Sequence, residues 1–179
     1  MLKKVLLGLV LLLLVGVGVV AALASQKSDE FTVTRSIVVD APASEVFVQV
    51  NDLENGQRWD PWVEMDPDAS YEFEGPRAGE GAKILWNGKK SGTGTMTIVE
   101  SRENELVRSE LAFIKPFEAV STAQFELEEV EAGQTKVTWS MHSTRNFPMK
   151  MLSVFMNCEK MAGEQFEKGL QNLKGVVEG

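Results

Sequence analysis

Hydrophobic and polar positions follow three different patterns along the 179-residue chain. Residues 5–24 form one uninterrupted apolar run. Between residues 31 and 143, apolar and polar residues alternate in short segments, which is typical of strands with one buried face. From Pro148 to Val177, apolar residues recur at steps of three and four, which predicts one long amphipathic helix. We therefore expect a leader segment, then a sheet, and then a helix that covers one face of the sheet.

Residues 1–24 predict a helix able to cross a membrane. Lys3 and Lys4 precede twenty apolar residues, which span about 30 Å as a helix, the thickness of one bilayer core. The A-x-A pattern at Ala22–Ala24 would suit cleavage of a signal peptide, but the run exceeds the usual signal core and favours a retained anchor. In both cases the lysines stay on the cytoplasmic side. The domain is then membrane-anchored on the non-cytoplasmic side, or secreted or periplasmic if the leader is cleaved.

Polar residues 25–30 predict a short tether, and residues 31–179 predict a single folded domain of ordinary size. A strand is expected from Phe31 to Val39. Two short helices should follow, one from Pro42 to about Asn51 and one within residues 52–58. The sequence Trp59-Asp60-Pro61-Trp62 then predicts a rigid turn.

Six further segments predict strands that short turns join into an antiparallel meander. One long helix after a run of strands predicts an α+β fold in which a curved sheet wraps around that helix. A single helix cannot fill the concave face of a bent sheet, so we expect a cavity between them. The predicted strands lie at residues 71–74, 82–86, 91–100, 106–113, 119–128 and 135–143.

Several stretches, taken in order, resemble the START/pollen-allergen helix-grip superfamily, in its polyketide cyclase/dehydrase (SRPBCC) branch. The resemblance implies a seven-stranded antiparallel sheet that grips the C-terminal helix and encloses an apolar pocket. The superfamily includes lipid carriers, hormone receptors, cyclases and chaperone cofactors, so the fold alone does not define the function. The stretches are RSIVVDAPASEVFVQVNDLENGQRWDPW at 35–62, GTGTMTIVESRENELV at 92–107, FIKPFEAVSTAQFELEE at 113–129, TKVTWSMH at 135–142 and KMAGEQFEKGLQNLK at 160–174.

Charge and motifs exclude several classes of function. The formal net charge is −8, and the part after the leader has 16 basic and 26 acidic residues without a basic stripe, so nucleic acid is not an expected partner. The single histidine and single cysteine cannot build a histidine-rich or cysteine-based metal site. We find no nucleotide-binding or hydrolase motif, and no cofactor is expected. The oligomeric state is left open.

Four polar residues are considered individually. His142 is expected on the wet face of its strand, and Asp60 is expected to cap a turn, so both are weak candidates for a general base. Cys158 is expected to be a small half-buried residue of the helix. Arg35 interrupts an apolar strand and would need an acidic partner if it points inward, for which Glu159 is the candidate. The alternative is that Arg35 forms an ion pair at the edge.

The apolar inward set is rich in tryptophan and methionine, which suit either a plain core or the wall of an adaptable pocket. The leading hypothesis is that the domain binds a hydrophobic, lipid-like small molecule without chemistry. The alternatives are an enzyme of the polyketide cyclase or dehydratase type, with His142 or Asp60 as base, and an envelope protein-interaction module. The predicted pocket residues are Trp59, Trp62, Trp86, Met96, Phe113, Phe117, Trp139, Met141, Met151 and Phe155.

Overall fold

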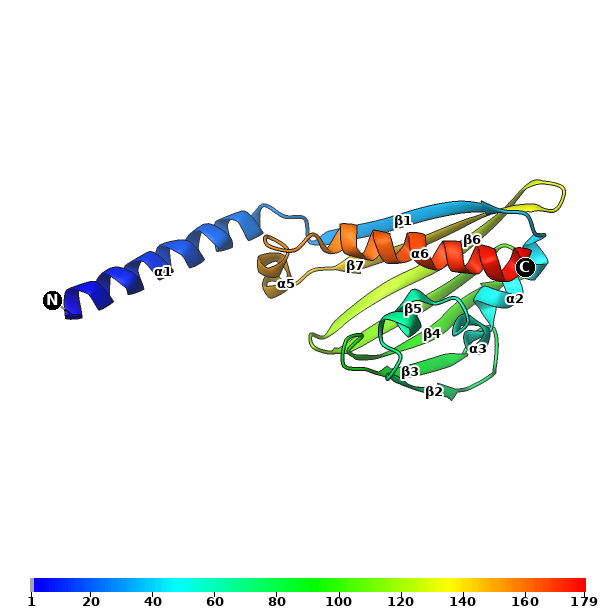
Figure 1. Cartoon of the computed structure of the whole chain (residues 1–179), viewed down its shortest axis with the longest axis horizontal. Coiled ribbons are helices and arrows are strands. Elements are labelled where there is room, and N and C mark those ends of the chain that lie inside the picture. The colour runs from blue at the N-terminus through cyan, green and yellow to red at the C-terminus, as the bar shows by residue number, and fades with distance from the viewer. Residues whose placement is uncertain (1) are drawn as a thin grey trace.

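The computed structural model describes residues 2–179, and Met1, the first residue of the predicted leader, lies outside them. A long N-terminal helix precedes an α+β domain (Figure 1). The elements in chain order are α1 (Leu2–Ser25), β1 (Glu30–Val39), α2 (Ala43–Asn51), α3 (Leu53–Gly56), α4 (Pro61–Met65), β2 (Ser70–Glu74), β3 (Lys83–Asn87), β4 (Thr93–Arg102), β5 (Leu106–Lys115), β6 (Ala119–Glu131), β7 (Gln134–Thr144), α5 (Phe147–Leu152) and α6 (Cys158–Glu178).

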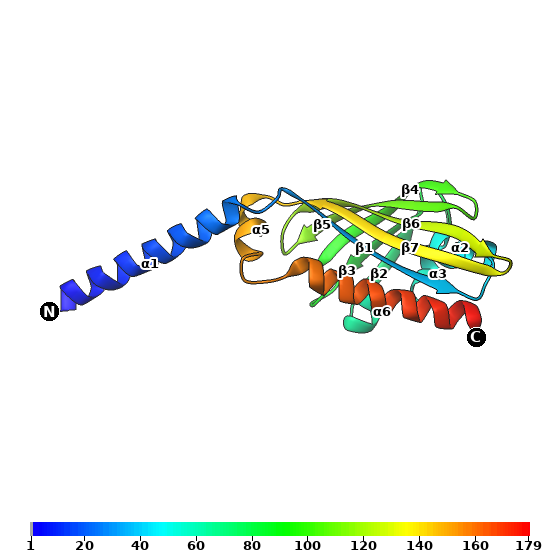
Figure 2. The same cartoon turned by 90° about the horizontal axis from the view of Figure 1, so that it is seen from above.

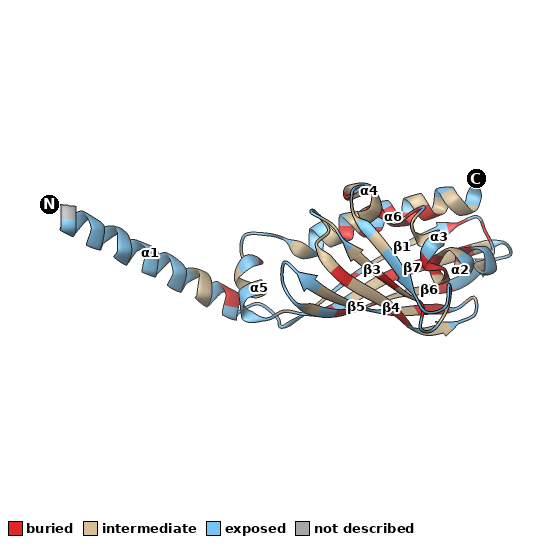
Figure 3. Ribbon diagram, turned by 90° about the horizontal axis from the view of Figure 1, so that it is seen from below, coloured by how far each residue is buried: buried red, intermediate tan, exposed pale blue. Residues whose placement is uncertain are grey.

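The seven strands form one antiparallel sheet in the order β1-β7-β6-β5-β4-β3-β2. This confirms the predicted meander, with β1 placed beside the last strand so that the first and last strands of the chain are neighbours. The alternation also predicted the faces correctly. Ile98, Val137 and Trp139 are buried on the inner face, while their sequence neighbours are exposed or half-buried. Figure 3 shows the buried residues concentrated on the strands and on α6.

The sheet curves around α6, which packs mainly against β1 (Figures 1 and 2). Phe166, Leu170 and Leu173 of α6 are fully buried. Two glycines let the helix approach closely. A Cβ at Gly163 would lie 2.2 Å from the guanidinium of Arg35, and one at Gly169 would lie 2.7 Å from the Trp139 ring. The helix-grip architecture predicted from the sequence is therefore confirmed.

The predicted single helix from Pro148 to Val177 is wrong in one respect, because it is split into α5 and α6. Ser153 ends α5 and donates its hydroxyl to the Lys150 carbonyl, and Asn157 begins α6 by accepting from the Lys160 N–H. Polar side chains that bond to nearby backbone groups favour helix ends over helix interiors. Cys158 therefore lies at the start of a helix and not in its middle.

Two further expectations need correction. The rigid turn predicted at residues 59–62 leads directly into a third short helix, α4, because Asp60 caps it and Pro61 occupies its first turn. Arg35 does point towards the helix, but its Nε lies 2.5 Å from Oε1 of Glu167, and Glu159 instead pairs with Arg145. The partner was wrong because the register of α6 against β1 cannot be read from the spacing along the chain.

α1 extends away from the domain along its long axis (Figures 1 and 2). It is the one helix among the described residues that is long and apolar enough to cross a membrane. Its side chains are exposed along most of its length, whereas Ala24 in its last turn is fully buried and the helix contacts α5. Such a helix is compatible with a membrane anchor or with a signal sequence.

Candidate functional site

An apolar cavity of about 200 Å³ lies between the concave face of the sheet and the helices. Strands β2 to β7 form its floor, and α2, α3, α4 and α6 cover it. Cavity walls of this kind, mostly hydrophobic with a few polar groups, are typical of small-molecule sites. The lining residues are Val50, Asp52, Leu53, Gly56, Gln57, Trp59, Asp60, Trp62, Tyr71, Ile84, Trp86, Ser91, Met96, Ser109, Leu111, Phe113, Ala123, Phe125, Trp139, Met141 and Phe166.

Aromatic rings form one wall of the cavity. The Trp139 ring stacks on Phe166 with ring centroids 4.1 Å apart and on Phe125 with centroids 4.8 Å apart. Trp59 and Trp62 meet Trp139 edge to face, at 5.8 and 5.7 Å. The Nε1 atom of Trp139 is buried and has no hydrogen-bond partner among residues 2–179. Five interlocked rings make this wall rigid and strongly apolar.

The structure brings seven of the ten predicted pocket residues to the cavity wall: Trp59, Trp62, Trp86, Met96, Phe113, Trp139 and Met141. Whether they contact a ligand stays a prediction. The other three, Phe117, Met151 and Phe155, lie outside the cavity, and that expectation is corrected. Phe117 lies in the β5–β6 turn, beyond the end of the alternating strand. Met151 lies in α5 and Phe155 lies in the break between α5 and α6, so the helical period that seemed to place them inward does not continue through them.

Asp60 is the main polar group of the cavity. Its Oδ1 accepts a hydrogen bond from the Trp62 N–H at 2.9 Å, which fixes the side chain as the cap of α4. Burial raises the pKa of Asp60 to about 6, although the bond from Trp62 acts in the opposite direction. A carboxyl group held in apolar surroundings resists ionisation because the charged form loses its hydration. Asp60 therefore changes its protonation state close to neutral pH.

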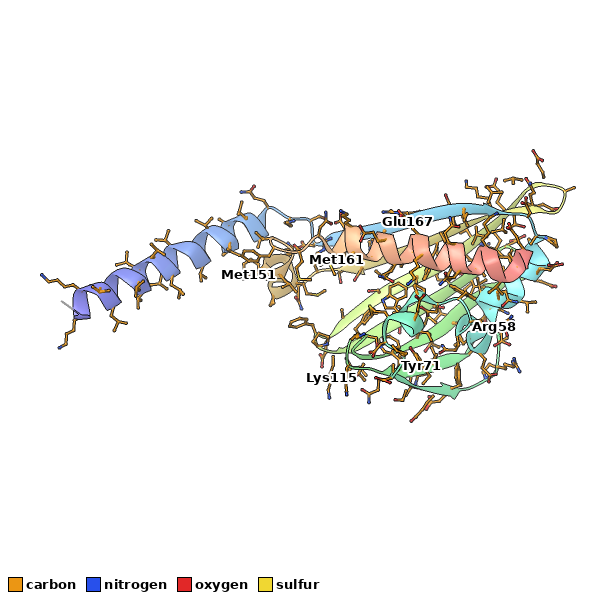
Figure 4. All side chains as sticks on the ribbon, viewed as in Figure 1. Arg58, Tyr71, Lys115, Met151, Met161 and Glu167 are labelled. Atoms are coloured by element: carbon orange, nitrogen blue, oxygen red, sulfur yellow. The ribbon has the colours of Figure 1, made fainter. Side chains whose placement is uncertain are left out.

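Tyr71 supplies a second polar group to the same cavity, from the edge strand β2 (Figure 4). Burial, together with the negative charges of Asp60 and Asp66, raises the pKa of its phenol. Tyr71 therefore remains a neutral hydrogen-bond donor at physiological pH. A titratable carboxyl and a phenol close to each other can orient a ligand that carries one polar group.

Asp66 holds the loop between β3 and β4 over the cavity without lining the cavity itself. Its Oδ2 accepts from the backbone N–H groups of Lys90 and Ser91, at 2.8 and 2.9 Å, and from the Ser91 hydroxyl at 2.9 Å. These bonds hold the pKa of Asp66 below its usual range. Ser91 lines the cavity, so this carboxylate positions part of the wall.

His142 lies away from the cavity, on the outer face of β7, where its Nδ1 is 3.1 Å from Oγ1 of Thr32 on β1. This places the second candidate base in solvent and leaves Asp60 as the one of the two that faces the cavity. Within residues 2–179 no cluster of histidine, cysteine and acidic side chains could hold a metal ion.

Sequence reasoning missed several residues of the wall. Tyr71 and Ser109 occupy inward positions of alternating strands, so the alternation could have identified them. Asp52, Leu53 and Gln57 belong to α3 and its two caps, where no periodic pattern indicates the buried side. Only the packing of α3 over the sheet brings these residues to the cavity.

Comparison with known proteins agrees with this architecture. No curated protein matches the chain. Among solved structures, a protein of Chromobacterium violaceum is similar with 15% identity and a TM-score of 0.60, over 83% of this chain and 97% of that one. Ara h 8.0201 has 15% identity and a TM-score of 0.58 over the same shares. Aha1 of Colwellia psychrerythraea has 17% identity and a TM-score of 0.59, over 83% of this chain and 96% of that one.

At these identities the solved structures show the fold and nothing about the ligand. The sequence itself matches the family described as polyketide cyclase / dehydrase and lipid transport over residues 30–178, which is most of the chain and the whole of the sheet with its gripping helix. That family and fold are compatible with binding of a hydrophobic molecule or with cyclase-like roles. The chain belongs to the polyketide cyclase/dehydrase and lipid transport family.

Proposed function

We propose that this protein is a membrane-anchored domain that binds a small hydrophobic molecule in the cavity under α6. The observation that supports this most is the composition of the cavity wall, in which aromatic and aliphatic side chains surround about 200 Å³ and only a few polar groups interrupt them. Water in such a cavity finds few hydrogen-bond partners, whereas an apolar ligand releases it to bulk solvent.

The volume limits the ligand. A cavity of roughly 150 Å³ lined by aliphatic and aromatic residues is enough to bind benzene. The cavity here is slightly larger. It therefore suits a ring compound, or the end of an acyl or isoprenoid chain whose remainder lies outside.

Asp60 and Tyr71 provide the polar contact for that ligand. When protonated, Asp60 donates a hydrogen bond to a ligand carbonyl or hydroxyl, and Tyr71 does so at any physiological pH. An uncharged ligand with one oxygen at one end fits this arrangement best. Ionised Asp60 disfavours an anionic ligand, so binding of a carboxylic acid is expected to weaken as the pH rises above about 6.

The perturbed pKa of Asp60 also favours a second function, catalysis of the cyclase or dehydratase kind. A general base works best when its pKa lies near the operating pH, and Asp60 meets that condition inside an apolar site. In this function Asp60 removes a proton from the bound substrate and the Tyr71 phenol donates to the oxygen that becomes negative. Binding comes first in both functions, so the binding test precedes the catalytic one.

The anchored state is part of the proposal. The possible cleavage site at Ala22–Ala24 lies inside α1, and Ala24 is fully buried beside the domain. Signal cleavage would remove a helix that contacts α5. These contacts support retention of α1 as a membrane anchor.

The test is uptake of an environment-sensitive aromatic dye by the full chain in detergent. Ala123 lies on the cavity wall, and Ala112 lies on the outer face of the neighbouring strand β5. Ala123→Phe adds a ring to the cavity, so we expect dye binding to fall at least tenfold. Ala112→Phe is the matched control and should bind like the wild type.

The proposal is wrong if the wild-type protein binds no dye at concentrations where circular dichroism shows that it is folded. Equal loss in both variants would also count against it, because the binding site would then not be the cavity. Release of a reaction product from a bound polyketide-like substrate, abolished by Asp60→Asn, would favour the catalytic function.

A further inference from the structure

The end of the domain nearest α1 carries exposed apolar side chains. Four phenylalanines are exposed among the described residues, and three of them, Phe117, Phe147 and Phe155, lie in the β5–β6 turn, in α5 and in the loop after α5. Phe155 is 74% exposed and Phe117 is 53% exposed. With Leu152 and Met156 they form what we term the proximal apolar surface. Exposed aromatic side chains gathered at one end of a domain indicate an interaction site.

The two parts of this surface lie at the same end of the molecule. Figure 4 labels Lys115, the last residue of β5, and Met151 of α5, and both lie at the end of the domain from which α1 extends. The view from above places α5 and the end of β5 beside each other again (Figure 2). α5 and the β5–β6 turn therefore lie at the same end of the domain.

Polar contacts hold this end against the chain that leaves the membrane helix. The Arg145 N–H donates to the Asp29 carbonyl at 2.6 Å, and Lys150 forms an ion pair with the Asp29 carboxylate. Arg145 also lies over the Phe31 ring, 4.3 Å from its centroid. The end of the predicted short polar tether is thus bound to the domain, and the proximal apolar surface lies at the end from which α1 extends.

Basic residues are concentrated at the same end of the domain. The segments at this end, residues 25–31, 88–92, 114–120 and 144–161, contain seven basic and four acidic residues. The rest of the domain contains nine basic and 22 acidic residues. Anionic headgroups therefore attract this end and repel the remainder, which favours one orientation on a membrane surface. Apolar residues flanked by basic ones are typical of segments that bind at the membrane interface.

We propose that the proximal apolar surface docks into the leaflet that α1 enters, with Phe117 and Phe155 inserted among the lipid headgroups. This rests on the proposed function, because it requires that α1 is retained as an anchor. It also identifies the bilayer as the source of the ligand. Phe113 and Met141 line the cavity close to the ends of β5 and β7 that point towards this surface, so we expect an apolar molecule to enter the cavity from this end.

The test uses the full chain reconstituted in vesicles of phosphatidylcholine with phosphatidylglycerol. Cys158 is the only cysteine, so Cys158→Ser gives a background for single labelling sites. An environment-sensitive fluorophore is attached to Phe155→Cys, to Phe117→Cys or to the control Val48→Cys. Val48 is 53% exposed on α2, at the opposite end of the domain from α1 (Figure 1).

We expect spin-labelled lipid to quench the fluorophores at 155 and 117 severalfold more than the one at 48, and quenching to weaken in vesicles without phosphatidylglycerol. Quenching that is equally low at all three positions would overturn the proposal and leave the surface to a protein partner. Dye uptake measured in detergent separates the two proposals. Absent quenching with normal uptake rejects only the docking, whereas strong quenching without uptake rejects only the ligand-binding function.

Discussion

Asp60 shows how position changes the chemistry of one residue type. Among the aspartates of this domain, Asp66 accepts three hydrogen bonds and has a lowered pKa, whereas Asp60 lines an apolar cavity, accepts one backbone bond and has a pKa raised to about 6. Hydrogen bonds stabilise the ionised form and burial destabilises it. The same side chain therefore serves as a structural tie in one place and as a titrating group in another.

Replacing Asp60 by asparagine tests this pKa through stability. Asparagine keeps the oxygen that caps α4 but does not ionise. In the wild type, the folded protein loses stability as the pH rises from the unfolded-state value of 3.8 to about 6, because only the unfolded chain ionises freely. Asp60→Asn should therefore be the more stable protein above pH 6, by about 3 kcal/mol at most.

Denaturant unfolding of the full chain in detergent at pH 4, 5 and 7 measures this difference. The advantage of Asp60→Asn should vanish near pH 4 and reach its full size above pH 6. Asp68→Asn, in the exposed segment after α4, is the matched control. A difference between Asp60→Asn and wild type that does not change with pH would show that burial does not perturb this carboxyl.

At the scale of elements, α6 depends on two close approaches. Gly169 faces Trp139 and Pro61, and a Cβ there would lie 2.7 and 2.9 Å from their rings. Gly175 lies on the same helix and a Cβ there would meet open space. The two positions separate the cost of crowding from the intrinsic helix preference of alanine.

Gly169→Ala should lower the free energy of unfolding by about 1–3 kcal/mol, because overpacking displaces the aromatic wall. Gly175→Ala should raise it by about 0.5–1 kcal/mol, since alanine is the better helix former. Unfolding curves of both variants under the same conditions make the comparison. If Gly169→Ala proved as stable as Gly175→Ala, this would contradict the close packing of α6 against Trp139.

At the scale of the whole molecule, the contacts of α1 with α5 predict that the leader stays attached. Protein from the membrane fraction of expressing cells should have the mass of the uncleaved chain and resist extraction with alkaline carbonate, because an apolar helix of this length holds the domain in the bilayer. A mature protein that begins after Ala24 and appears in the soluble fraction would contradict the anchor.

The sequence by itself determined the elements whose cause is local. Period-two alternation identified the later strands and their inner faces, and the unbroken apolar run identified α1, because side-chain direction follows directly from backbone geometry. The ordered resemblances identified the family. Five of the seven expected pocket residues that reached the cavity wall did so for the same reason, since they occupy inward positions of strands, whereas Trp59 and Trp62 lie beside and in α4.

Tertiary structure alone decided the features that depend on registration between distant segments. The partner of Arg35 followed from the position of α6 against β1, and the exposure of Phe155 followed from the break that Asn157 caps. The raised pKa of Asp60 required the surrounding rings to exclude water. These effects depend on burial and on contacts between residues far apart in the chain. The order of residues along the sequence does not give the distances between them in the folded protein.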